Sequence, residues 1–342
     1  MKMLWLSPYG DGWSIAAKIR DAGHKVILVS PAENQNGVGY LPKVALEADW
    51  LPYAMKSDVV VVDNAFPSRR TKRSWNPSNE ALLLTDIKRK GVPVMGPLPT
   101  MELLENDERY ARKILQRFAL PYLQGGDDNA IRLTLSTDGQ MWYAIWRHRA
   151  LLGGSGSPGL GNLGDLVLKL APCPLTQEFQ YLVEFAFSHG KGGYFNLSTV
   201  FDSEGNFYVE QLRSGFLYPA IFGQFPDLLS LDSDREHSDL RLAVTLLQFD
   251  RDGATAPESI VNQPGFFGGQ LHREDTQTTQ RDVFHGVFVG ALAANGPWPI
   301  VQNKIYRHLG GTGLTFREDI GSSIVHDLEL LKEWGWLSNG TT

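Results

Sequence analysis

Residues 3–29 read MLWLSPYGDGWSIAAKIRDAGHKVILV. Two short apolar runs, residues 3–6 and 26–29, flank residues 14–22, where Ile15, Ala16 and Ile19 recur at helical spacing and Gly23 fits a helix stop. A continuous apolar run of this length is typical of a strand that is buried on both faces. The stretch therefore predicts a strand, a tight loop, a helix and a second strand parallel to the first.

Two further apolar runs extend this pattern along the chain. They occupy residues 58–63 and 92–95, and a probable helix over residues 80–88 separates them. Alternating strands and helices predict a doubly wound parallel sheet. Because such sheets bind ligands beyond the carboxyl ends of their strands, the candidate ligand loops are residues 7–14, 30–39 and 63–70.

The first of these loops has the chemistry of an anion site. Gly10 and Gly12 let backbone amides approach a phosphate closely, and Ser14 can cap the helix that follows. We therefore expect Gly10, Asp11, Gly12 and Ser14 to bind substrate. A plain structural turn is the alternative interpretation of the same residues.

The pattern changes after residue 96. A helix is predicted over residues 100–118, and a hairpin over residues 131–149 turns at Asp138-Gly139. A glycine-rich loop, residues 153–164, precedes a second hairpin whose strands are residues 194–202 and 206–212, and the last predicted helix covers residues 324–334. We expect three parts: an N-terminal domain over residues 1–96, a middle region over 97–260 and an α+β segment over 261–342.

Composition narrows the function classes for these 342 residues. The net charge of −6 gives no whole-chain signal for nucleic-acid binding. A single cysteine, Cys173, excludes an intrachain disulfide, and four histidines, His148, His189, His285 and His308, lack a spacing that indicates zinc. No secretory signal or membrane-spanning run is recognisable, so we expect a cytoplasmic protein without a membrane partner.

Four sequence segments occur in a particular order. They are Gly91–Pro97 followed by Glu105–Tyr110 and Leu120-Pro121, the loop Ser157–Gly164, the strand Val209–Arg213 and the segment Leu314–Gly321. In this order they resemble phosphoribosylamine–glycine ligase (glycinamide ribonucleotide synthetase) of the ATP-grasp superfamily, and in particular its divergent relatives encoded by bacteriophages. The resemblance covers most of the chain.

The resemblance implies an α/β fold in which an N-terminal Rossmann-like (pre-ATP-grasp) parallel sheet precedes a degenerate α+β ATP-grasp-like domain. It implies an ATP-dependent carboxylate–amine ligase that uses Mg²⁺ and acts on a nucleotide or phosphosugar amine. Glu210 and Arg213 are the implied catalytic residues, and Glu210 is the implied metal ligand. Substrate binding is implied for Ser157, Gly159, Gly161, Arg317 and Asp319, beside the residues of the first loop.

The sequence also departs from the family pattern in the region that would grip ATP. Only 31 residues separate Pro121 from Gly153, so the small ATP-covering subdomain is expected to be missing, and no lysine occurs between Lys113 and Lys169. Three cations, Arg147, His148 and Arg149, fall on a later strand, where an exposed basic strand end is the alternative interpretation.

The metal strand departs from the family pattern as well. Leu212 stands where the family has a donor Asn, Gly159 replaces another Asn, and Arg213 falls one residue early. Because a one-residue offset turns a strand side chain to the other face, either a β-bulge compensates or the site is lost. A salt bridge to Arg213 or another cation is the alternative role for Glu210.

Two function hypotheses follow from these observations. The first is an active ATP-dependent ligase with ATP and Mg²⁺. The second is a catalytically inactive relative without such cofactors, which binds a nucleotide or phosphosugar or a protein partner. A partner chain or a second copy of the chain that supplies the missing elements is a third possibility.

Overall fold

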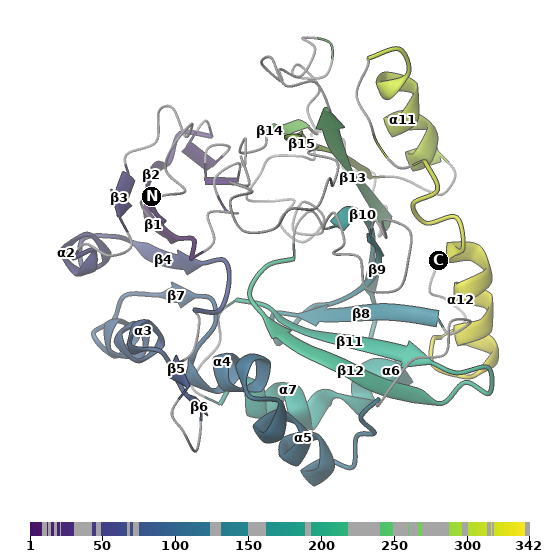
Figure 1. Cartoon of the computed structure of the whole chain (residues 1–342), viewed down its shortest axis with the longest axis horizontal. Coiled ribbons are helices and arrows are strands. Elements are labelled where there is room, and N and C mark those ends of the chain that lie inside the picture. Colours follow the sequence, from purple (N-terminus) through teal and green to yellow (C-terminus); the bar gives the residue numbers. More distant parts are fainter. Residues whose placement is uncertain are drawn as a thin grey trace, which may run out of the picture.

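A computed structural model of the chain describes most of its secondary structure (Figure 1). The described residues are 1–8, 12, 15–16, 19–20, 22–30, 43–45, 49–66, 69–70, 75–123, 131–149, 162–188, 193–217, 240–248, 259, 266–268, 287–295, 300–312, 316 and 318–338. Within these residues no helix combines the length and the apolar character needed to cross a membrane.

The N-terminal sheet has five parallel strands: the apolar runs predict four of them, and the strand over residues 43–45 was not predicted. The five strands are β1 (Lys2–Leu6), β2 (Lys25–Ser30), β3 (Lys43–Ala45), β4 (Val59–Val62) and β7 (Val94–Met95), in the spatial order β3-β2-β1-β4-β7. The described positions of the first predicted helix, residues 15–16 and 19–20, are helical. Helices α2 (Leu51–Ala54) and α3 (Asn79–Arg89) follow, and β5 (Arg69–Arg70) pairs with β6 (Trp75–Asn76).

The helix predicted over residues 100–118 is two helices, α4 (Pro99–Asn106) and α5 (Glu108–Arg117). Asp107 lies between them with an extended backbone (φ −115°, ψ 94°), and its side chain accepts a hydrogen bond from the Tyr110 amide at 3.1 Å. An Asp at this position starts a new helix because its carboxylate satisfies an amide that has no partner within the helix. The prediction of one continuous helix was therefore wrong.

The second sheet is antiparallel and has eight strands in the order β12-β11-β8-β9-β10-β13-β15-β14. Their bounds are β8 (Ile131–Thr137), β9 (Trp142–Arg149), β10 (Asn162–Leu170), β11 (Phe195–Phe201), β12 (Phe207–Ser214), β13 (Leu240–Gln248), β14 (Phe266–Gly268) and β15 (Val287–Asn295). Both predicted hairpins, β8–β9 and β11–β12, are present. The sheet contains strands from both sides of the domain boundary predicted at residue 260.

One sequence prediction about a loop needs a correction. Residues 162–164, the end of the predicted glycine-rich loop, belong to β10, which pairs with β9 through a register shift between Asn162 and Gly164. Pairing with neighbours on both sides of β10 outweighs the low strand propensity of glycine there. The rest of that loop, with Ser157, Gly159 and Gly161, lies outside the described residues.

The two faces of the antiparallel sheet have different neighbours. One face packs against α4, α5, α6 (Pro174–Glu178), α7 (Gln180–Ala186), α11 (Ile300–Leu309) and α12 (Ile324–Glu333), and forms the largest core. On the other face Tyr143, Ile145 and Val167 share a second core with Trp5 and Val61 of the parallel sheet. The two sheets therefore meet on the face opposite the helices (Figure 1).

The C-terminal helix is held to the β11–β12 hairpin by tryptophans. Trp334 stacks on Phe201 with ring centroids 6.3 Å apart, and Trp336 packs edge-on against Phe207 at 5.3 Å. The Trp336 indole donates to the carbonyl of Gly205 at 2.8 Å. These tryptophans therefore pack the last helix against the hairpin.

Candidate functional site

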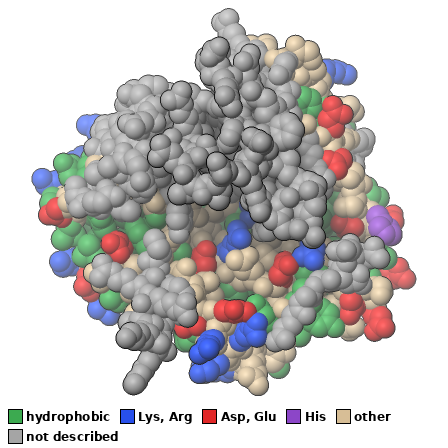
Figure 2. All heavy atoms as spheres, viewed as in Figure 1, with side chains coloured by type: hydrophobic (Ala, Val, Ile, Leu, Met, Phe, Trp, Pro, Cys, Tyr) green, Lys and Arg blue, Asp and Glu red, His purple; other side chains and the backbone are tan. Residues whose placement is uncertain are grey.

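The candidate site lies where the carboxyl ends of the parallel strands meet the antiparallel sheet. The chain leaves β1 toward β2 on one side and reaches β4 on the other, so the strand order reverses next to β1. Ligands of open α/β sheets bind at such a reversal, beyond the strand ends. In Figure 2 several acidic and basic side chains lie in the central part of the visible face.

A buried carboxylate, Asp63, follows β4 at this edge. Its Oδ2 accepts hydrogen bonds from the Ser7 hydroxyl at 2.5 Å and the Trp5 indole at 3.3 Å, and its side chain is fully buried. The Ser7 hydroxyl oxygen in turn accepts the Gly12 amide at 3.0 Å. A Cβ on Gly12 would lie 2.1 Å from the Trp5 indole nitrogen and 2.3 Å from the Asp63 carboxylate. Only glycine fits here, so the network fixes one end of the predicted anion loop.

The backbone of Asp63 also binds the end of β12. The Phe216 amide donates to the Asp63 carbonyl at 2.6 Å, and Asn64 forms an antiparallel bridge with Gly215. Gly215 has φ +86°, and a Cβ there would lie 2.2 Å from the Asp63 carbonyl oxygen. These contacts leave no room for side chains between the two sheets at this point.

The second half of the site is the face of the antiparallel sheet opposite the helices, along β8, β11 and β12. We call it the polar face, because it carries Arg132, Thr134, Ser136, Asn196, Ser198 and Glu210. Ser136 donates to the Asn196 side-chain oxygen at 2.6 Å, and the Asn196 amide donates to the Gly215 carbonyl at 2.9 Å. Buried hydrogen bonds thus run from the polar face to the residues that contact Asp63.

Strand β12 contains a β-bulge at Glu210. Ser198 of β11 pairs with Gln211 and Thr199 pairs with Val209, which leaves Glu210 as the extra residue. Glu210 and Gln211 are both exposed, whereas Val209 and Leu212 are buried in the helical core. The bulge therefore absorbs one residue, so that Arg213 pairs with Asn196 and lies on the face opposite the buried Val209 and Leu212.

Glu210 forms an ion pair across the sheet. Its Oε1 accepts from the Arg132 guanidinium at 2.7 Å, and both side chains are nearly half exposed. An exposed pair of this kind contributes little to stability, about 0 to 1 kcal/mol. The salt bridge that the sequence left open as an alternative for Glu210 is thus formed, with Arg132 rather than Arg213 as its partner.

The end of β12 is anchored by a second carboxylate. Glu105 of α4 accepts hydrogen bonds from the Ser214 amide at 2.9 Å and the Ser214 hydroxyl at 2.7 Å. Burial raises the pKa of Glu105, while the hydrogen bonds from Ser214 and the charge of Arg213 lower it. Arg213 therefore lies close enough to Glu105 to be influenced by it, next to the candidate site.

A further cation on the second sheet is paired within the sheet. The Arg147 Nε donates to Asp165 Oδ1 at 3.3 Å, and Asp165 is fully buried. These residues pair across β9 and β10, on the face that also carries Ile145 and Val167. The exposed basic strand end considered from the sequence is therefore wrong for Arg147; the side chains of His148 and Arg149 lie outside the described residues.

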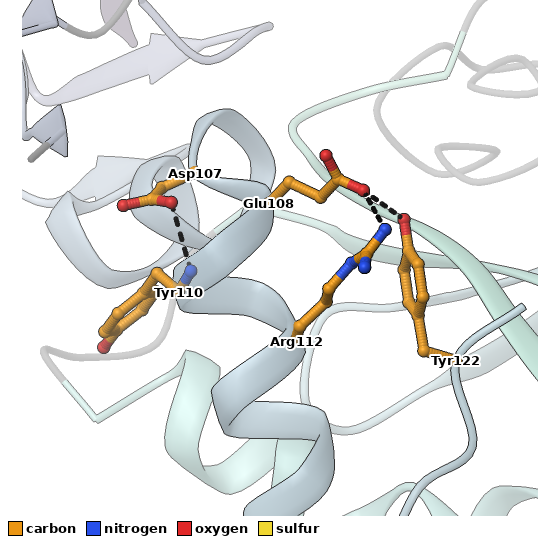
Figure 3. A network of polar contacts seen from close by, with 5 residues as sticks. All are labelled: Asp107, Glu108, Tyr110, Arg112 and Tyr122. Atoms are coloured by element: carbon orange, nitrogen blue, oxygen red, sulfur yellow. Dashed lines mark hydrogen bonds and ion pairs between the residues drawn. The ribbon is translucent and has the colours of Figure 1, made fainter. Parts of the chain in front are cut away.

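The edge of β12 next to the bulge is held by a surface cluster (Figure 3). Arg112 donates to Glu108 at 2.5 Å and lies over the Tyr122 ring, whose hydroxyl donates to the same carboxylate at 3.2 Å. Residues 121–123 hydrogen-bond with Val209, the residue before the bulge, at 2.8 and 2.9 Å. The cluster thus belongs to the scaffold that holds Glu210 at the sheet edge.

The predicted site residues fall into three groups. Gly12 lies in the Asp63 network, and Glu210 and Arg213 lie on β12. Asp319 is exposed, and its neighbour Ile320 is buried in the core on the helical face of the sheet; no hydrogen bond or ion pair between described residues links Asp319 to Glu210. The remaining predicted residues, Gly10, Asp11, Ser14, Ser157, Gly159, Gly161 and Arg317, lie outside the described residues.

Sequence reasoning placed Ser7 and Asp63 in candidate ligand loops without singling them out, and it missed Asn196 and Arg132. Ser7 and Asp63 stand at the ends of predicted strands, and this position was the available signal. Asn196 and Arg132 gave a weaker signal, since alternation along their strands shows only that they face away from the core.

The part of the chain that the structure describes does not bring together a set of metal ligands. Among the described residues, no group of three or more His, Cys, Asp and Glu side chains is placed to hold a metal ion. Mg²⁺ commonly binds one or two protein carboxylates and completes its shell with phosphate oxygens and water. Glu210 could be the one protein ligand of a metal ion that is held mainly by the phosphates of a nucleotide. The metal would then share the Glu210 carboxylate with Arg132 or replace Arg132 there.

The fold is shared with several solved structures. No protein-family model matches the sequence, and no curated protein matches it. Phosphoribosylamine–glycine ligase from Thermotoga maritima is 13% identical with a TM-score of 0.58, over 94% of this chain and 100% of that chain. The phosphoribosylaminoimidazole carboxylase ATPase subunit from Aquifex aeolicus is 10% identical (TM-score 0.57; 91% and 100% covered). The biotin carboxylase domain of a single-chain bacterial carboxylase is 11% identical (0.55; 98% and 96%). The chain thus shares its fold with these proteins, and the predicted α/β class, a parallel sheet followed by an α+β part, is confirmed.

Proposed function

We propose that the chain is an ATP-dependent carboxylate–amine ligase that acts on a nucleotide or phosphosugar amine, with ATP and Mg²⁺ as cofactors. The observation that carries this proposal is the placement of Glu210 and Arg132 on the polar face. Another residue of the same face, Asn196, is connected to the Asp63 network through Gly215. The similarity to phosphoribosylamine–glycine ligase supports the same class. Kinship with phage-encoded relatives belongs to this proposal as well.

The proposed reaction has two steps. A carboxylate oxygen attacks the γ-phosphorus of ATP, which forms an acyl phosphate and releases ADP. The amine then attacks the acyl carbon, so that an amide forms, a proton is released, and phosphate leaves with one oxygen from the original carboxylate. Cations that face the developing negative charge accelerate both steps.

The residues of the polar face have definite tasks in this scheme. The Arg132 guanidinium binds phosphate or carboxylate oxygens, for which its planar fork of donors is suited. Glu210 would hold the metal ion, which would supply positive charge next to the phosphates, and Arg213 would add positive charge at the same strand end. Magnesium, when bound, shields the phosphate charges and orients the nucleotide.

The transfer of a carboxylate oxygen to phosphate tests the proposal directly. The protein would be incubated with Mg-ATP, [¹⁸O]glycine as the carboxylate and phosphoribosylamine as the amine, and the released phosphate analysed by mass spectrometry. We expect phosphate that carries one ¹⁸O, and a loss of that signal of at least about 100-fold in Glu210→Ala. Glu184→Ala, an exposed carboxylate on α7, is the matched control and should keep the signal.

A second candidate function is supported by the Arg132–Glu210 pair itself. A carboxylate that is already neutralised by a guanidinium is a poorer metal ligand, which favours a non-catalytic protein that binds a nucleotide or phosphosugar and needs no ATP or metal. In that case ribose 5-phosphate or a nucleotide raises the melting temperature without Mg²⁺, and no ¹⁸O-labelled phosphate forms.

A further inference from the structure

We propose that Asp63, acting through Ser7, is a positioning residue that sets the place of Gly12 relative to β12, and thereby shapes the site for a pentose phosphate. The inference rests on the proposed function for the class of ligand. It concerns a different part of the site from Glu210 and Arg132.

The geometry behind this inference is a continuous chain of buried hydrogen bonds. On one side, the Gly12 amide binds the Ser7 hydroxyl, which donates to the Asp63 carboxylate. On the other side, the Asp63 carbonyl accepts the Phe216 amide at 2.6 Å, just beyond the end of β12. Ser7 and Asp63 are fully buried, and Phe216 is 2% exposed. One residue thus contacts both halves of the candidate site.

The backbone packing at this joint gives it little freedom. The Gly12 Cα hydrogen faces the Trp5 indole and the Asp63 carboxylate, and Gly215 faces the Asp63 carbonyl, in each case with no space for a methyl group. Gly193 packs in the same way on Gly96, where a Cβ would lie 2.5 Å from the Gly96 Cα. Glycines therefore seat the ends of the parallel strands directly on the ends of the antiparallel ones.

The network stabilises the fold, but stability alone does not account for its location. A second network elsewhere has the same design: the Ser78 hydroxyl donates to the buried Glu102 carboxylate at 2.8 Å and accepts the Ala81 amide at 3.0 Å. That network joins α3 to α4 and contains none of the candidate site residues. Ser78→Ala and Ser7→Ala thus remove equivalent hydrogen bonds, one of them outside the site.

The test compares ligand binding in these two variants of the full chain. Isothermal titration calorimetry would measure the Kd of ribose 5-phosphate, with ribose and inorganic phosphate as separate probes. Because Ser7→Ala removes the hydroxyl that binds both the Asp63 carboxylate and the Gly12 amide, we expect a Kd at least about tenfold higher in this variant. Ser78→Ala should keep the wild-type Kd, while both variants lose similar amounts of thermal stability. Ser7→Thr retains the hydroxyl and should restore tight binding.

Each outcome separates this inference from the proposed function. Equal Kd values in the two alanine variants, or no binding of ribose 5-phosphate to the wild type, would overturn the positioning role. Selective loss of binding in Ser7→Ala without any ¹⁸O transfer in the wild type would support the positioning role and remove the ligase. If Ser7→Ala does not fold, Ser7→Thr decides. A wild-type Kd in Ser7→Thr supports the positioning role. A higher Kd in Ser7→Thr, with the melting temperature unchanged, overturns it.

Discussion

The buried carboxyl of Glu102 makes the stability of the protein depend on pH in a predictable way. Glu102 is fully buried on α4, and its two oxygens accept the Ser78 amide at 2.5 Å and the Ser78 hydroxyl at 2.8 Å. The pKa of Glu102 is raised to about 7, since burial and the charges of Glu80 and Glu105 raise it by more than the two hydrogen bonds from Ser78 lower it. The change to consider is Glu102→Gln, which keeps the shape and removes the titration.

The sign and size of the effect follow from this pKa. Below pH 4.5 the carboxyl is protonated in both the folded and the unfolded chain, so the raised pKa does not lower the free energy of unfolding there. Between pH 4.5 and 7 the unfolded chain loses this proton first, so the free energy of unfolding falls as the pH rises. The full loss above pH 7 is about 3 kcal/mol, since each pKa unit corresponds to 1.36 kcal/mol. Relative to the wild type, Glu102→Gln should therefore gain about 2 to 3 kcal/mol between pH 5 and pH 8.

Urea unfolding of both proteins at pH 5 and pH 8 measures this difference. Comparing the two proteins at each pH cancels the titration of the carboxyls that they share. Glu184→Gln, on the exposed face of α7, is the matched control and should follow the wild type at both pH values. A Glu102→Gln difference that changes by less than about 0.5 kcal/mol between pH 5 and pH 8 would refute the argument from burial.

Two further predictions concern packing. Gly12→Ala forces a methyl group into the Asp63 network, so it should lower the free energy of unfolding in urea by about 2 to 4 kcal/mol. Gly310→Ala is the control, because no atom lies closer than 3.9 Å to its new Cβ. Its free energy of unfolding should stay within about 0.5 kcal/mol of the wild type. Trp334→Ala removes the ring that stacks on Phe201 and should lower the free energy of unfolding by about 2 to 3 kcal/mol. Tyr181→Ala changes a side chain that is 70% exposed and should have little effect on stability. Equal melting temperatures for these two variants would contradict the packing role of Trp334.

The sequence is most informative where structure is local. Four of the five parallel strands are short apolar runs, so these four follow from the pattern alone, whereas β3 has no such run and was not predicted. The Asp107 break in the long helix was missed although the signal was present, because Asn106-Asp107 are strong capping residues. Strand β13 was not predicted, since its pairing partners β10 and β15 are distant in sequence.

The bulge at Glu210 is an intermediate case. Two adjacent polar residues, Glu210 and Gln211, interrupt the alternation of buried and exposed residues along β12. The sequence shows that the alternation fails there, but a bulge and the loss of the site are equally compatible with that failure. Only the pairing register with β11 distinguishes the two, and it places the extra residue at Glu210.

The joint between the two sheets is the part that the sequence could not supply. Ser7 and Asp63 are 56 residues apart, and Asp63 and Phe216 lie much farther apart still, so no local pattern links them. A glycine such as Gly215 indicates that another part of the chain packs closely against its backbone. Which residue packs there, in this case Asp63, depends on which strand ends lie side by side. If the site requires the two sheets to be held at a fixed distance, the decisive residues are those whose partners are distant in sequence. They combine buried polar atoms with glycines, and both features become interpretable only when the strand order is known.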